Sequence, residues 1–143
     1  QLKEGKTDLV IVDSYGDVFN GNMNDNHVVR SVLNKYQKLS EKYDVLFIFL
    51  HHTGKRTENN GPNKNNIIGS QAFEAKMRLV MELRKPDNTS RRDLHFTKGN
   101  YLPDSLKNQP LQLVFDNKQQ FQFIGNVSGL SIGGRTFSEQ EKQ

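Results

Sequence analysis

Residues 8–14 read DLVIVDS, in which residues 9–12 form an unbroken run of β-branched and apolar side chains that ends in Asp13 and Ser14. A run without polar alternation is typical of a strand that is covered on both faces, as in a parallel sheet. A second run of this kind, VLFIFL, occupies residues 45–50. We therefore expect two parallel strands, at 8–13 and 45–50.

The segment between the two runs predicts one long amphipathic helix. Apolar side chains recur at three- and four-residue spacing from Val28 to Tyr43, and basic side chains take the opposite face. Asp25 or Asn26 can cap its first turn. Strand, helix and strand form one βαβ unit, whose crossover is expected to be right-handed.

The chain beyond residue 53 contains shorter elements. A loop rich in glycine, asparagine and cations is expected at 53–69, followed by a short helix through Met77 that Ser70 can cap. The later apolar runs predict a β-meander, with strands at 79–83, 94–97, 111–115 and 121–123. The expected fold class is α/β, with an open, mixed and mostly parallel sheet. Residues 1–124 are expected to form one domain, and residues 125–143 a loosely held tail.

Composition narrows the class of protein. The chain has 143 residues, a formal charge of +4 and a pI near 9.3, which mildly favours an anionic partner such as nucleic acid or nucleotide. It has no cysteine, which excludes disulfides, a thiolate nucleophile and a Cys-ligated zinc. No apolar run approaches the ~20 residues that cross a bilayer, so no membrane association is expected. Residue 1 is Gln and no signal peptide follows, which favours a cytoplasmic piece of a longer protein.

Ligands of open α/β sheets bind outside the carboxyl ends of the parallel strands, so the residues after each strand are the candidates. Asp13 follows the first strand, where a rigidly held carboxylate can orient Mg²⁺ and its waters. The alternative is that Asp13 caps a turn or a helix.

The second strand is followed by His51-His52-Thr53-Gly54-Lys55. Two imidazoles, a hydroxyl and an ammonium group can together recognise an anion. Zinc bound by Asp13, His51 and His52 is a second possibility, although adjacent histidines in extended chain point to opposite faces. In the third interpretation, one histidine packs under the loop and the other is solvated.

Two further basic features are candidates. Lys98, at the end of a later strand, can meet a phosphate of its own or a neighbouring subunit, or it can be a solvated turn lysine. The loop at 54–66 carries Lys55, Arg56 and Lys64, which can contact a nucleic-acid backbone, although it has no aromatic residue for base stacking.

Five motifs occur in an order and at a spacing that resemble the C-terminal half of a RecA-like ATPase: DLVIVDS at 8–14, NDN at 24–26, FLHHTGK at 49–55, GSQAF at 69–73 and KGNY at 98–101. The sequence is most similar to the hexameric plasmid-replication helicases of the RepA type, which are AAA-family ATPases related to replicative DNA helicases. The resemblance covers residues 7–124.

The resemblance implies a role for each matching residue. Asp13 would be the Walker B aspartate that holds the Mg²⁺ shell, with Ser14 beside it at the nucleotide. His52 would sense the γ-phosphate, with His51 next to it in the same motif. Lys98 and Asn100 would reach a nucleotide across a subunit interface of a homo-oligomeric ring, expected to be a hexamer.

The remaining implications concern DNA. The loop after Lys55, as far as Gly69, would face DNA, in single-stranded form, in the ring's central channel, and Ser70 and Gln71 would start the helix behind it. The arginine finger common near the strand-end motif is not evident, because Gly99 and Asn100 occupy its positions, and Arg78 or Arg84 are the candidates in its place.

One departure limits what the chain can do by itself. No G-x-x-x-x-G-K-[ST] phosphate loop is present, so ATP and Mg²⁺ are expected in the parent protein and not tightly bound to this chain alone. The parent is expected to be an ATPase of plasmid, phage or mobile-element replication. The alternatives are a non-catalytic DNA- or protein-binding module and a metal-dependent hydrolase that uses Asp13, His51 and His52.

Overall fold

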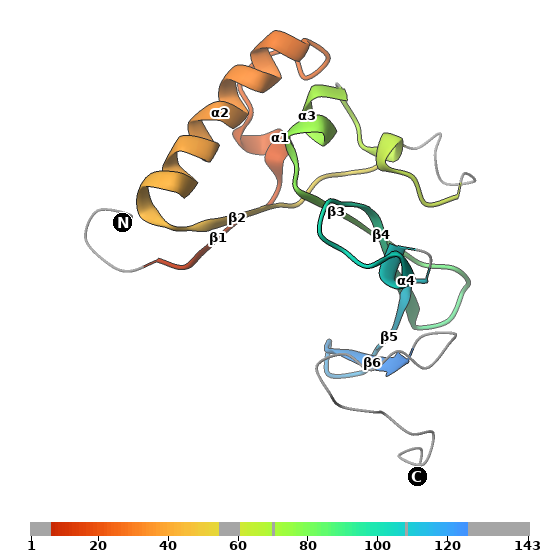
Figure 1. Cartoon of the computed structure of the whole chain (residues 1–143). Coiled ribbons are helices and arrows are strands. Elements are labelled where there is room, and N and C mark those ends of the chain that lie inside the picture. Colours follow the sequence, from red (N-terminus) through yellow and green to blue (C-terminus); the bar gives the residue numbers. More distant parts are fainter. Residues whose placement is uncertain (1–6, 55–60, 70, 108, 126–143) are drawn as a thin grey trace. The chain divides into compact units, whose positions relative to one another are not determined.

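The computed structural model describes residues 7–54, 61–69, 71–107 and 109–125 (Figure 1). Lys55, Arg56, the predicted cap Ser70 and the predicted tail beyond Gly125 lie outside these ranges. The chain divides into two compact units, residues 1–77 and 78–143. Each unit is described by itself.

The first unit contains the predicted βαβ arrangement (Figure 1). Strand β1 (Leu9–Val12) pairs in parallel with β2 (Leu46–Phe49), with Leu9 opposite Leu46 and Val12 opposite Phe49. Helix α2 (Asn26–Tyr43) connects them. These elements confirm the prediction of two parallel strands and a helix of about five turns.

The ends of α2 follow from two aspartates. The Asp25 carboxylate accepts hydrogen bonds from the backbone N–H groups of His27, at 2.8 Å, and Val28, at 3.2 Å, so it caps the helix as predicted. Asp44 ends the helix in the left-handed conformation, with φ of 51°. This turn leads directly into β2.

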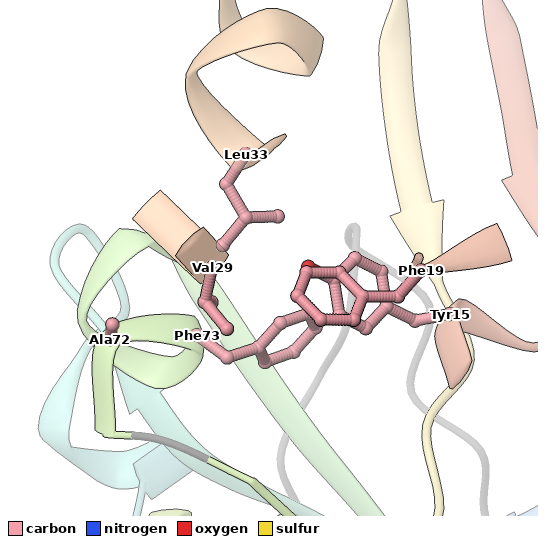
Figure 2. Packing of buried hydrophobic residues seen from close by; sticks show 6 residues of the cluster. All are labelled: Tyr15, Phe19, Val29, Leu33, Ala72 and Phe73. Carbon is pink, nitrogen blue, oxygen red and sulfur yellow. The ribbon is translucent and has the colours of Figure 1, made fainter. Parts of the chain in front are cut away.

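The core of the first unit is aromatic. It joins α2 to two short helices, α1 (Tyr15–Val18) and α3 (Gln71–Lys76), and the 3-10 helix η2 (Lys64–Asn66) precedes α3. Figure 2 shows the rings from α1 and α3 lying together, with apolar side chains of α2 beside them; the labelled residues are Tyr15, Phe19, Val29, Leu33, Ala72 and Phe73. Helix α1 was not predicted.

One face of the β1–β2 pair is exposed, whereas both faces were expected to be covered. Leu9, Ile11 and Leu46 share a face of the pair and are 45%, 58% and 59% exposed. The opposite face is packed, because Phe47 and Phe49 contact the ring of Tyr36 from α2. A single crossover helix covers only one side of a two-stranded sheet, which explains the difference.

The second unit is an antiparallel meander, β3 (Leu79–Arg84), β4 (Arg91–Gly99), β5 (Leu111–Phe115) and β6 (Phe121–Gly125), with the short helix α4 (Asp104–Lys107) after β4. The meander was predicted, and the class α/β is correct for the described residues. A single mostly parallel sheet is not observed, because the described strands form a parallel pair and a separate four-stranded antiparallel sheet. Only one helical crossover joins strands in these ranges, and neighbours joined by short turns pair antiparallel.

Within the described ranges, no helix combines the length and the apolar character that a membrane span requires.

Candidate functional site

The carboxyl ends of β1 and β2 lie side by side. The Leu50 N–H donates to the Val12 carbonyl at 2.9 Å, and the Tyr15 N–H donates to the Leu50 carbonyl at 2.9 Å. These bonds continue the strand pairing past both strand ends, so Asp13-Ser14 and His51-His52 are neighbours. The Asp13 side chain is exposed at this edge.

Ser14, which was expected to contact a nucleotide, forms hydrogen bonds with a residue three positions later in the chain. Its hydroxyl donates to Asp17 Oδ2 at 2.7 Å and its backbone N–H donates to the same oxygen at 3.2 Å. The peptide bond that joins Asp13 to Ser14 is cis. The two hydrogen bonds from Ser14 hold the pKa of the Asp17 carboxyl below its usual value, and the charge of His52 adds a smaller effect. Asp17, which the sequence did not single out, therefore belongs to this edge.

The two adjacent histidines have different environments. His51 is partly buried, with its ring 4.9 Å from that of Phe73 and 5.7 Å from that of Tyr15, whereas His52 is exposed. Burial, and then the charge of His52, lower the pKa of His51. Of the three interpretations left open above, this geometry fits the one in which one histidine packs under the loop and the other is solvated.

Backbone contacts join the two ends of the predicted DNA loop next to the C-terminal end of β2. Thr53 and Ile67 form an isolated antiparallel bridge, and the Ile68 N–H donates to the His52 carbonyl at 3.3 Å. Gly69, at the end of the loop, has φ of +104°, and a Cβ there would meet the Met23 carbonyl oxygen at 3.1 Å. The position of His52 is thereby linked to the loop that begins one residue later.

Lys64, the one proposed DNA-contact residue that the described ranges include, lies beside a cavity of about 320 Å³ between α2, η2 and α3. Its ammonium group is 3.7 Å from Glu74 Oε1, and its side chain is 49% exposed. Arg30 of α2 lies on the wall of the same cavity. The sequence placed Arg30 only on the polar face of the helix, because nothing in its spacing relates it to Lys64.

Lys98 and Asn100, expected at a nucleotide, belong to the second unit, which is described by itself. Lys98 is partly buried in β4 opposite Val80, and Asn100 is exposed in the following turn. Gly99 between them allows a close approach, since a Cβ at this position would clash with the Leu102 side chain. Of the arginines considered above, Arg84 is paired with Glu82 at 3.6 Å and Arg78 is exposed.

The donor set at the edge suits magnesium better than zinc. In the described part of the chain, no group of three or more histidines and acids is placed to hold a metal ion. The Nε2 atom of His51 is buried and so is not available to a metal shared with Asp13. A single exposed carboxylate fits Mg²⁺, which is commonly held by one or two carboxylates, waters and substrate phosphates.

A partial phosphate-loop pattern lies at the other end of β1. Residues 5–7 read GKT, which is how a phosphate loop ends, but β1 begins two residues later in the sequence, at Leu9. A phosphate loop opens a helix, whose N-terminal amides cradle the phosphates. These residues therefore do not supply the missing phosphate loop.

Comparison with known families gives one result for the first part of the chain. Residues 1–58, which include β1, α1, α2 and β2, match the family described as an AAA domain. This family belongs to the P-loop NTPases, so the match supports an AAA or RecA-like ATPase relationship for this segment. No curated protein matches the chain.

Proposed function

We propose that this chain is part of a nucleic-acid-dependent ATPase motor, of the hexameric helicase type, that serves the replication of a plasmid, phage or mobile element. The observation that supports this proposal most strongly is the pairing of the β1 and β2 ends, which places Asp13 and His52 at the same edge of the strand pair. Proteins of this architecture bind ligands at that edge. The AAA-domain match over the same strands supports the ATPase class.

Each residue at the edge has a distinct task in this proposal. Magnesium would neutralise phosphate charge when ATP is bound. Asp13 accepts hydrogen bonds from the water shell of the ion through an exposed carboxylate. His52 donates a hydrogen bond to the terminal phosphate. Asp17 fixes Ser14, and with it the turn that follows Asp13. Lys98 and Asn100 act at the nucleotide of a neighbouring subunit.

The DNA contact in this proposal is the loop at 54–69. Lys64 and Arg30, which both line the cavity, would contribute positive charge to the DNA contact together with Lys55 and Arg56. The Ile68-to-His52 hydrogen bond then offers a route by which a change at the phosphate reaches the DNA loop. Single-stranded DNA is the partner that the resemblance to ring helicases implies, and the cations of this loop would contact its phosphate backbone.

The nucleotide assignment is tested by hydrolysis in the native protein that contains this chain. Asp13→Asn should reduce ATP turnover by about 100-fold or more, since it removes a charge from the magnesium shell. Asp8→Asn is the matched control, because Asp8 is an exposed aspartate at the opposite end of β1. Wild-type turnover in Asp13→Asn contradicts the proposal.

The DNA assignment is tested by the salt dependence of single-stranded DNA binding. Replacing Lys55, Arg56 and Lys64 with alanine should weaken binding and reduce the salt slope by about 0.7 for each phosphate that these cations neutralise. The charge-matched control replaces Lys35, Lys38 and Lys42, which are exposed on α2. Equal slopes in wild type and the loop variant exclude the loop as the DNA-binding surface.

A non-catalytic binding module is the second candidate. The exposed apolar face formed by Leu9, Ile11 and Leu46 favours it, since faces of this kind commonly contact other proteins. DNA or protein binding without any magnesium-dependent turnover in the native protein would support this candidate over the motor. The metal-dependent hydrolase loses support from the buried Nε2 of His51.

A further inference from the structure

The rings of Tyr15, His51 and Phe73 contact one another in the first unit. Tyr15 and Phe73 lie 4.6 Å apart, centroid to centroid, and the His51 ring lies 4.9 Å from Phe73 and 5.7 Å from Tyr15. These distances are those of ordinary aromatic contacts. The three residues come from three segments, the start of α1, the exit of β2 and the middle of α3. We call them the ring triad.

The His51 ring presents a buried nitrogen to this triad and has a hydrogen bond with the His52 backbone. Its Nε2 atom is buried and has no hydrogen-bond partner among the described residues, and neither has the buried Tyr15 hydroxyl. Burial disfavours an imidazolium ion in this position more than the hydrogen bond with the His52 backbone favours it, so the pKa of His51 is lowered. A group kept neutral and enclosed in this way is poorly suited to contact a substrate.

His52 is directed to the opposite side by the same packing. Successive side chains of an extended chain point to opposite faces, so enclosing His51 exposes His52. The backbone is held on both sides of the pair, by the Leu50 carbonyl bonded to Tyr15 and by the His52 carbonyl bonded to Ile68. We propose that His51 is a positioning residue, whose ring, packed against those of Tyr15 and Phe73, directs His52 outward beside the end of β1.

This inference rests on the proposed function only for the role of His52 at the phosphate. The orientation of His52 does not depend on that function. The orientation itself is measurable without nucleotide, from the ring-proton NMR signals of His52 and its rate of carbethoxylation in the intact chain. His51→Phe should leave both unchanged, because a phenyl ring fills the same place. His51→Ala should move the His52 signals toward random-coil values and change its modification rate.

A stability control separates positioning from general destabilisation. Leu33→Ala also removes buried apolar contacts of the first unit, from α2, but Leu33 is not part of the ring triad. It should lower the melting temperature and leave the His52 signals unchanged. Unchanged His52 signals in His51→Ala overturn the inference, and so does a His51→Phe variant as perturbed as His51→Ala, which would mean that the imidazole itself is required.

Hydrolysis by the native protein distinguishes this inference from the proposed function. His51→Ala should lower kcat by about tenfold or more with KM little changed, since small misplacements of an active-site group are costly, and His51→Phe should restore it. If His52→Ala leaves hydrolysis intact while the His52 signals respond to His51→Ala, the sensor assignment fails and the positioning role stands. If His51→Phe has the kcat of His51→Ala, the positioning role fails.

Discussion

Near the ends of β1 and β2, some single residues carry polar groups that are buried. The sequence predicts this burial only in part. Tyr15 is 1% exposed, and its hydroxyl has no partner among the described residues. Burial, and then the charge of Tyr36, raise the pKa of Tyr15 to about 12. The phenol is therefore neutral at physiological pH, and its contribution to the fold comes from its ring.

Replacing Tyr15 tests this division between ring and hydroxyl. Tyr15→Phe should leave the free energy of unfolding unchanged or raise it by about 1 kcal/mol, because it removes a buried unpaired hydroxyl. Tyr15→Ala should lower it by about 3–5 kcal/mol, because it removes a buried ring. Chemical denaturation measures both values. A loss of more than about 1 kcal/mol in Tyr15→Phe would mean that the hydroxyl has a partner.

His51 was one of two histidines for which the sequence left three interpretations open. The choice between them depends on Tyr15 and Phe73, which are 36 residues before and 22 residues after it in the chain. Local spacing predicts that the two imidazoles point in opposite directions, but it does not say which of them faces the core. Asp17 was missed for a related reason, since its link to Ser14 and His52 arises only once α1 has formed.

Elements with a strong local pattern were predicted best. The unbroken apolar runs predicted β1 and β2, and the three- and four-residue spacing predicted α2. The start of β4 was placed three residues late, because Arg91 and Asp93 are polar. They belong to the strand because β5 pairs with it there and because the Arg91 guanidinium binds the Asp93 carboxylate at 2.8 and 2.9 Å.

The N-terminal cap of α2 gives a prediction at the scale of one element. Asp25→Ala should lower the free energy of unfolding of the first unit by about 1 kcal/mol, because two backbone N–H groups lose their acceptor. Asn24→Ala is the matched control one residue earlier and should change it by less than about 0.5 kcal/mol. Thermal melts followed by circular dichroism compare the two. Equal melting temperatures would show that the helix does not depend on this cap.

At the scale of the whole molecule, the structure has two compact units, and the single domain expected over residues 1–124 stays a prediction. Apolar periodicity identifies strands and helices, but it carries no information on how many cores they share. The mostly parallel sheet was an extrapolation from one βαβ unit to the later strands. Those strands are joined by short connections such as the turn between Phe115 and Phe121, which favour antiparallel pairing.

Each of the two units contains one partly buried histidine, His51 or His95, that should make stability depend on pH. Burial is the main cause that lowers the pKa of His51 and of His95, while Asp93 and Glu82 partly oppose it at His95. The unfolded chain therefore binds more protons below the ordinary pKa of 6.5. Each histidine should reduce stability as the pH falls from about 6.5 toward its folded-state pKa, and have no effect at higher pH.

Melting temperatures at about pH 7.5 and about pH 5 check this prediction. His51→Phe and His95→Phe should each reduce the difference between the two values relative to wild type, the first in the unit at 1–77 and the second in the unit at 78–143. Exposed carboxylates change the melting temperature equally in wild type and in the variants, so their effect cancels in the comparison. An unchanged difference in His51→Phe would mean that His51 is protonated without cost in the folded chain.

The central claim is that Asp13 and His52 serve one magnesium–nucleotide site, and a double-mutant cycle on ATP hydrolysis by the native protein tests it most directly. If the two side chains act on the same phosphate, Asp13→Asn and His52→Ala together should be little worse than the more damaging single change. The account is contradicted if the two losses multiply, as for independent sites, or if neither change affects hydrolysis.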